Sequence, residues 1–107
     1  MFTKDPATLF YSDLSETEAQ KWVAYTRPHP KSCSFYRPKR AGYDGIDVAY
    51  LYAEKDCVVP LFAQEQLVEA VKLKGVAVSE WRLPSGHFPS LSMPDILADK
   101  IVEIISA

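Results

Sequence analysis

The apolar run Val48–Ala53 is the feature that most restricts what this chain can fold into. Successive side chains of a strand point to opposite faces, so a run built from valine, alanine, leucine and tyrosine has no face suited to water. Strands of this kind are typical of parallel sheets that helices cover on both sides. The sequence therefore predicts a strand over these residues, in an α/β fold with parallel strands.

The residues after this run predict a strand–helix–strand–helix order for the second half of the chain. Pro60 is expected to start a helix that continues to Lys74, with Gly75 as a good C-cap. Alternating side chains over residues 76–83 predict a second strand, one side of which is more polar, as near a sheet edge. Because a crossover of this length joins parallel strands, we expect the two strands to be parallel and their connection right-handed.

Both helices of this half carry apolar faces, and the last helix is expected to dock firmly on the sheet. That last helix follows Ser92–Asp95, which has the S-x-x-D pattern of a capping box. The apolar face of the helix over residues 60–74 comprises Phe62, Gln66, Leu67, Ala70, Val71 and Leu73. The stripe of the last helix comprises Ile96, Leu97, Ile101, Val102, Ile104 and Ile105.

The first 45 residues predict two helices and a long loop. Asp5 and Pro6 suit the N-cap and the first position of a short helical turn. Ser15–Glu18 has the capping-box pattern, and a helix is expected from there to about Thr26. Residues 31–44 show no regular pattern and predict a long ordered loop, a kind of segment that often serves as a lid or binding element.

Length and charge limit the classes of protein to which the chain can belong. Its 107 residues allow at most one domain, and the net charge of −2 gives no electrostatic case for binding nucleic acid or an anionic membrane. No apolar run approaches the roughly 20 residues that a membrane-spanning helix needs. Residues 1–6 lack the basic region and long apolar stretch of a signal peptide, so we expect a cytoplasmic protein.

The cysteines and histidines give no pattern of a metal site. Cys33 and Cys57 are too few and too far apart for a zinc site or a disulfide framework, so free thiols are expected. His29 and His87 lack any spacing typical of metal ligands. We therefore expect no protein-built metal centre and no cofactor.

Two strands are too few to cover the apolar faces expected for the first strand and the last helix. Three or more strands, or extensive packing, normally make a stable sheet. We therefore expect the chain to pack against further protein or to self-associate, as a homodimer or with a partner chain. The alternative is a compact α+β mini-domain in which the N-terminal helices cover the two-stranded sheet.

Asp56 and His87 each follow a predicted strand, which in a parallel sheet places both at the same edge. An imidazole can take and return a proton, while a carboxylate beside it fixes its tautomer and stabilises the imidazolium. We therefore consider an Asp56–His87 hydrogen bond plausible. The simpler reading is that Asp56 caps a turn or the following helix, and that His87 is a surface loop residue.

The segments around these two residues resemble the C-terminal third of the α/β-hydrolases, most closely the esterase and hydroxynitrile-lyase-like branch. They are Leu51–Asp56, with Val59-Pro60 after it, and Leu83–Pro94, which contains S-G-H-F-P-S-L-S-M-P. Leu9–Ser15 and Ala19–Val23 resemble the lid segment of the same branch. The resemblance implies a partial α/β-hydrolase fold, with residues 1–45 as a lid-like segment and residues 46–107 as the C-terminal part of the core.

The same resemblance implies roles for individual residues. Asp56 would be the acid and His87 the base of a catalytic triad, in the chain order of this family. Trp22, Phe35 and Tyr36 would line the pocket for a small apolar substrate with an ester-like bond. The alternative interpretation is that these three aromatic residues belong to the core.

The chain departs from the family pattern in one decisive respect. The nucleophile of the family stands in G-x-S-x-G on a tight turn, and none of the four glycines here frames such a motif. Ser85 and Cys57 are better explained as loop and packing residues, since no base is evidently placed for either. Three hypotheses follow: a hydrolase portion inactive alone, a chain completed by a partner that supplies the nucleophile, or a non-catalytic binding or assembly protein.

Overall fold

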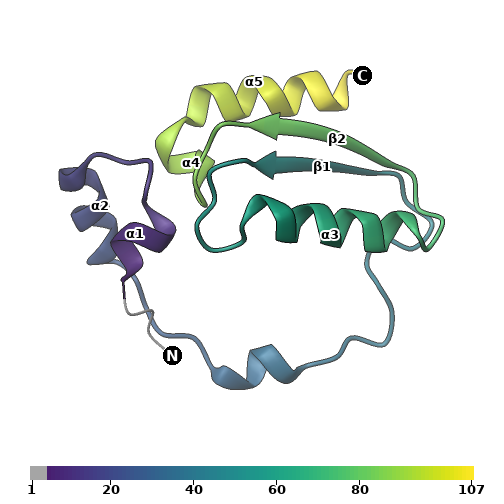
Figure 1. Ribbon diagram of the computed structural model, residues 1–107, viewed down its shortest axis with the longest axis horizontal. Helices are drawn as coiled ribbons and strands as arrows, with labels where there is room; N and C mark the ends of the chain where they lie inside the picture. The colour runs from purple at the N-terminus through teal and green to yellow at the C-terminus, as the bar shows by residue number, and fades with distance from the viewer. Residues whose placement is uncertain (1–4) are drawn as a thin grey trace.

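The computed structural model describes residues 5–107, so the first four residues of the predicted 1–45 segment, and most of the stretch compared with signal peptides, lie outside it. The described chain is a mixed α/β structure (Figure 1). Its elements in chain order are α1 (Pro6–Phe10), α2 (Glu16–Val23), the short 3-10 helix η1 (Lys31–Phe35), β1 (Val48–Ala53), α3 (Leu61–Lys72), β2 (Val78–Leu83), α4 (Pro89–Ser92) and α5 (Pro94–Ile105).

The two strands pair in parallel, as the crossover length predicts. Val48 lies opposite Val78, and the register continues to Ala53 opposite Leu83. β1 has the predicted bounds, whereas β2 begins two residues later than predicted. Gly75, which follows α3, has the positive φ of 83° that its predicted capping role requires.

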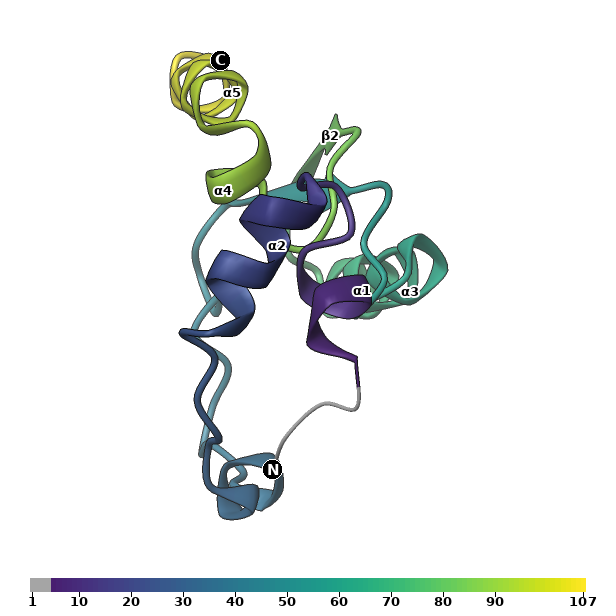
Figure 2. The same ribbon diagram turned by 90° about the vertical axis from the view of Figure 1, so that its left-hand side faces the viewer.

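α3 and α5 lie on opposite sides of the sheet (Figure 2). On the α3 side, Gln64 and Val68 are the buried residues of that helix. The predicted apolar face of α3 is therefore wrong in part, because Phe62, Leu67 and Leu73 are exposed. The amide of Gln64 explains this orientation, since it turns inward to bind the backbone at the end of β1.

The bonds of Gln64 join three chain segments. Its Oε1 accepts a hydrogen bond from Ala53 N–H (3.1 Å), while its Nε2 donates to Ala53 O and to Val59 O (both 2.8 Å). A backbone N–H or C=O group that is buried without a partner is costly, so these bonds stabilise the point where β1 ends.

α5 does not dock firmly, contrary to the prediction from its apolar stripe. None of its residues is buried, and four large apolar side chains of the stripe are exposed: Ile96, Ile101, Val102 and Ile105. On this side the Lys100 Nζ atom lies 5.8 Å from the centre of the Trp81 ring. The sheet offers α5 only a narrow surface, because within residues 5–107 it has two strands.

The predicted capping box at Ser92–Asp95 is also wrong. Pro89 starts a helical turn of its own, so Ser92 ends α4, and its hydroxyl donates back to Phe88 O (3.5 Å). Met93 then takes the N-cap position of α5, without a side-chain hydrogen bond.

The N-terminal caps follow the predictions, except that no hydrogen bond from Ser15 N–H to the Glu18 carboxylate completes the capping box within the described residues. The Asp5 side chain accepts a hydrogen bond from Thr8 N–H, and the Ser15 hydroxyl accepts one from Glu18 N–H. α2 ends at Val23, three residues before the predicted end at Thr26, because Tyr25 and Thr26 donate to carbonyls three residues back.

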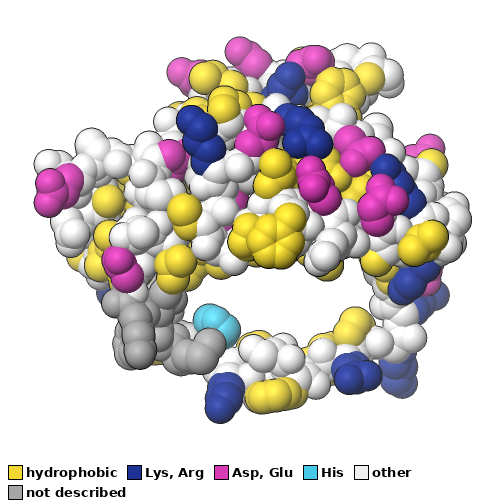
Figure 3. Space-filling view, viewed as in Figure 1, with side chains coloured by type: hydrophobic (Ala, Val, Ile, Leu, Met, Phe, Trp, Pro, Cys, Tyr) yellow, Lys and Arg dark blue, Asp and Glu magenta, His cyan; other side chains and the backbone are white. Residues whose placement is uncertain are grey.

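Residues 27–47 form an arm that leaves the body and returns to it (Figure 1). The sequence predicts irregular structure over 31–44, and the short helix η1 corrects this at Lys31–Phe35. Figure 3 shows an opening through the molecule between this arm and the body. The arm therefore borders a space that no described part of the chain fills.

The described chain is extended and exposes much surface for its size. Its radius of gyration is 15.7 Å, against about 13 Å for a compact domain of this length. Its accessible surface is 7899 Å², against about 6000 Å² for a folded monomer of this mass. α1 and α2 lie beyond one end of the strands instead of covering the sheet (Figure 1). The structure therefore disagrees with a compact mini-domain.

Replacing Gln64 with leucine should lower the free energy of unfolding by about 3 kcal/mol, because it leaves backbone groups of Ala53 and Val59 unpaired. Gln66→Ala, at an exposed position of the same helix, is the matched control and should change it by less than about 0.5 kcal/mol. Urea unfolding followed by circular dichroism measures both; equal effects of the two variants would contradict the role given to Gln64.

Tyr52 should ionise later than an ordinary tyrosine. Burial, with 1 % of the residue exposed, and the hydrogen bond from its hydroxyl to Glu80 Oε1 (2.7 Å) raise its pKa from 10.0 to about 12. The folded state thus favours the neutral phenol, so this contribution to stability is complete below pH 10 and is lost as the pH rises through about 12.

Phenolate absorbance across this pH range tests the shift. The component that titrates at about pH 12 should disappear in Tyr52→Phe and remain in Tyr36→Phe, which removes an exposed hydroxyl. A late component that persists without Tyr52 would assign the shift to another tyrosine.

Candidate active site

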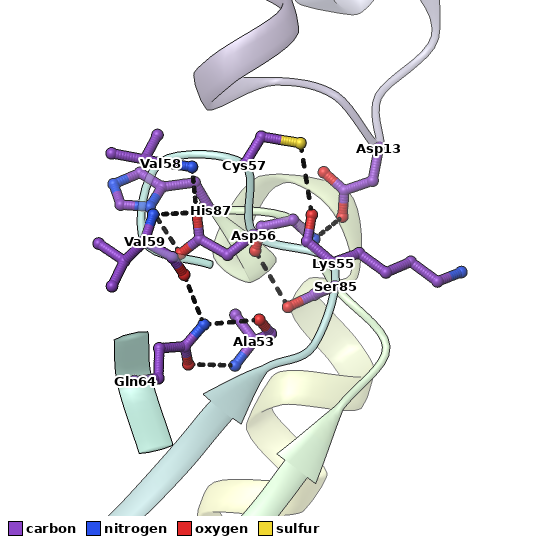
Figure 4. A network of polar contacts seen from close by, with 11 residues as sticks. Asp13, Ala53, Lys55, Asp56, Cys57, Val58, Val59, Gln64, Ser85 and His87 are labelled. Carbon is purple, nitrogen blue, oxygen red and sulfur yellow. Dashed lines mark hydrogen bonds and ion pairs between the residues drawn. The ribbon is translucent and has the colours of Figure 1, made fainter. Parts of the chain in front are cut away.

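The loops after β1 and β2 lie side by side at the carboxyl edge of the sheet. Glu54 N–H donates to Leu83 O, and Lys55 N–H donates to Ser85 O, both over 2.9 Å. The Glu54 bond continues the parallel ladder past the ends of the strands, whereas the Lys55 bond joins the two loops outside the ladder pattern. They bring Asp56, from the first loop, next to His87, from the second (Figure 4).

The Asp56 carboxylate uses both of its oxygens. Oδ2 lies 2.9 Å from His87 Nδ1, while Oδ1 accepts hydrogen bonds from Val58 N–H (2.7 Å) and Val59 N–H (3.1 Å). The side chain is only 7 % exposed. The sequence left open whether Asp56 caps its own turn or binds His87. In the structure Asp56 does both.

The geometry fixes how His87 presents its two ring nitrogens. An ionised carboxylate only accepts hydrogen bonds, so Nδ1 is assigned as the donor to Asp56. Nε2 is then the acceptor, and it points away from Asp56 (Figure 4). With 26 % of the side chain exposed, Nε2 is placed to accept a proton from a group that approaches from outside.

Aromatic rings surround the imidazole. The ring centres of Phe10 and Phe88 lie 5.6 Å and 4.8 Å from that of His87, and Tyr11 stacks on Phe88 at 5.7 Å. Phe10 and Tyr11 come from the N-terminal segment, 76 or more positions before the histidine. Their side chains make the surroundings of the imidazole largely apolar.

Ser85 and Cys57 are not bonded to the imidazole. Ser85 is fully buried, and its hydroxyl donates to Gly86 O (3.1 Å). The thiol of Cys57 is exposed and lies 3.7 Å from Lys55 O. The structure thus supports their interpretation as loop residues, and over residues 5–107 no hydroxyl or thiol is hydrogen-bonded to His87.

The structure does not bring the three predicted pocket residues to this site. Trp22 packs against Tyr25 with ring centres 5.8 Å apart, while Phe35 and Tyr36 are 73 % and 77 % exposed in the arm. Within residues 5–107, no ring contact or hydrogen bond joins any of the three to Asp56 or His87. Their role in substrate binding therefore stays a prediction.

Sequence reasoning missed Asp13 and the part played by Phe10. The Asp13 carboxylate accepts a hydrogen bond from Gly86 N–H over 2.7 Å, directly beside the histidine. Leu9–Tyr11 is recognisable as an apolar cluster, but its distance in sequence from His87 gives no sign that the two meet.

Within residues 5–107 no three His, Cys, Asp or Glu residues come together in a way that could hold a metal ion. In the same part of the chain, no helix is both long enough and apolar enough to cross a membrane.

Comparison with curated proteins finds similarity to a protein from Phoma sp. (strain ATCC 20986 / MF5453) that is named "Probable hydrolase R7". The two sequences are 40 % identical over 78 residues, which is 71 % of this chain and 32 % of the relative. The chain thus matches about a third of the length of that protein. No family model matches the chain. The similarity suggests a hydrolase.

Asp56→Asn should reverse the tautomer of His87. Val58 and Val59 N–H hold the amide oxygen in place of Oδ1, so the NH₂ group faces the imidazole and Nδ1 must become an acceptor. The ¹⁵N chemical shifts of the ring should then change from an Nδ1–H to an Nε2–H pattern. Asp95→Asn, at an exposed position, should leave the pattern unchanged; an unaltered tautomer in Asp56→Asn would contradict the assignment.

Proposed function

We propose that this chain is the acid-and-base portion of an α/β-hydrolase that acts on ester-like bonds of small apolar substrates. The observation that carries the proposal is the 2.9 Å contact between Asp56 Oδ2 and His87 Nδ1, with Nε2 turned outward. The relative named as a probable hydrolase supports it, as does the strand–acid–helix–strand–histidine order.

In this proposal His87 is the base. Nε2 takes the proton of a hydroxyl nucleophile as that oxygen attacks the carbonyl carbon of the ester. Asp56 stabilises the imidazolium that forms, and Nε2 then gives the proton to the departing alcohol. A second round, with water in place of the nucleophile, releases the acid. Phe10 and Phe88 favour substrates whose groups near the reacting bond are apolar.

The nucleophile must come from outside the described residues. Ser85 cannot serve without leaving its buried position, and Cys57 has no bonded base. An oxyanion hole also has to be supplied, since acid and base alone give little acyl transfer. The activity is therefore proposed for an assembly or a longer protein that contains this chain, and the chain alone should be inactive.

Ester hydrolysis tests the proposal. The native protein or complex that contains these residues is purified, its intact mass is determined, and its turnover of short-chain p-nitrophenyl esters is compared with that of the 107-residue chain. The native material should hydrolyse the esters, and His87→Ala should reduce kcat roughly 10⁴-fold or more. The isolated chain should show no turnover above buffer.

His29→Ala is the matched control, because it removes the other histidine of the chain, in the segment between α2 and η1. Its turnover should equal that of the unsubstituted protein. Native material that keeps its activity in the His87→Ala variant would contradict a catalytic role for that residue.

A second candidate is a non-catalytic binding or assembly protein derived from the same fold. The exposed apolar side chains of α3 and α5 favour it, together with an accessible surface of 7899 Å² where about 6000 Å² is normal. An excess of this size is that of one side of an extensive permanent interface. A stable dimer or complex without any turnover, in native material, would select this candidate.

A further inference from the structure

The Asp13 carboxylate holds the histidine loop from the N-terminal segment. Its Oδ2 accepts a hydrogen bond from Gly86 N–H over 2.7 Å, joining residues 73 positions apart. Figure 4 shows Asp13 on the segment between α1 and α2, with its carboxylate directed at the loop after β2. A hydrogen bond to an ionised acceptor is stronger than one between neutral groups.

We propose that Asp13 is a positioning residue, which fixes the backbone directly before His87 and thereby the direction of its imidazole. The inference rests on the proposed function in one respect only, namely that the orientation of His87 matters for proton transfer. Asp13 acts through Gly86 and is assigned no contact with a substrate.

The Ser85–Gly86 peptide group, which precedes His87, is held at both of its polar atoms. Ser85 O accepts a hydrogen bond from Lys55 N–H of the acid loop, while Gly86 N–H donates to Asp13. The Ser85 residue is fully buried. With Nδ1 on Asp56 as well, His87 is restrained both at its side chain and at its preceding backbone.

Gly86 is required for this close approach. A Cβ atom at this position would lie 2.6 Å from Asp13 Oδ1, 2.9 Å from Asp13 Cγ and 3.1 Å from Ser12 Oγ. The first two separations are shorter than real contacts allow, so a larger residue would have to displace the carboxylate. The absence of a side chain at Gly86 and the carboxylate at Asp13 thus form one steric unit.

The same segment also covers the imidazole. Phe10 lies three positions before Asp13, and its ring centre is 5.6 Å from that of His87. Binding Gly86 through Asp13 therefore keeps Phe10 against the ring. The segment consequently fixes both the loop and one apolar neighbour of the imidazole.

NMR of the His87 imidazole in the 107-residue chain tests the inference. In the unsubstituted chain, the Nδ1–H proton bonded to Asp56 should give a protected downfield signal. Asp13→Ala should increase the population with a broken Asp56–His87 bond roughly tenfold, seen as faster exchange and weakening of this signal. Asp13→Asn should retain the signal, because the amide oxygen can accept the same Gly86 N–H.

Asp99→Ala is the matched control, since it removes an exposed aspartate of α5. It should leave the Nδ1–H signal unchanged, and circular dichroism should show the same helix content in every variant. An Asp13→Ala chain with an unchanged signal would overturn the inference, and so would a complete loss of the signal in Asp13→Asn with the fold intact.

A double-mutant cycle tests the steric unit. Gly86→Ala should weaken the signal in the unsubstituted chain but add little to Asp13→Ala, because the truncated residue 13 no longer meets the new Cβ. Equal damage in both backgrounds would contradict it. Since the imidazole signal needs no turnover, failure of ester hydrolysis and failure of this inference are separate outcomes.

Discussion

The parallel pairing of β1 with β2 is the constraint on which the site depends. Parallel strands end at the same edge, so the acid after one and the histidine after the other are brought to one edge of the sheet. The bond from Glu54 N–H to Leu83 O extends this pairing past the strands, and the bond from Lys55 N–H to Ser85 O then joins the two loops. Gln64 then secures the end of β1 from the side of α3. The 2.9 Å contact between Asp56 and His87 is thus built on backbone hydrogen bonds of the sheet.

Local chemistry made several features predictable from the sequence. The bounds of β1, the caps at Asp5 and Ser15 and the positive φ of Gly75 each depend on residues within a few positions of one another. The meeting of Asp56 and His87 was predictable for a related reason. It follows from the parallel direction of the two strands, and the length of the crossover predicts that direction.

Features that depend on distant partners could not be predicted. The apolar stripe of α5 indicates a buried face, but the described sheet is too narrow to cover it. The orientation of α3 is set by Gln64, a polar residue that no hydrophobic pattern selects. The bond between Asp13 and Gly86 has no local signal at either end. At Ser92 a local pattern was present but misleading. The capping-box pattern predicts that Ser92 caps the last helix, whereas Pro89 starts a separate helical turn that ends at Ser92.

The bond between Asp13 and Gly86 also bears on the order in which this structure can form. Loop closure over 73 residues is entropically costly and is slow compared with the formation of a local turn. During synthesis, the N-terminal segment leaves the ribosome long before its partner glycine exists. The histidine loop acquires its full set of contacts only when Asp13 and Gly86 are both present. The backbone directly before His87 therefore gains its contact with the N-terminal segment only after the 73 intervening positions have been made.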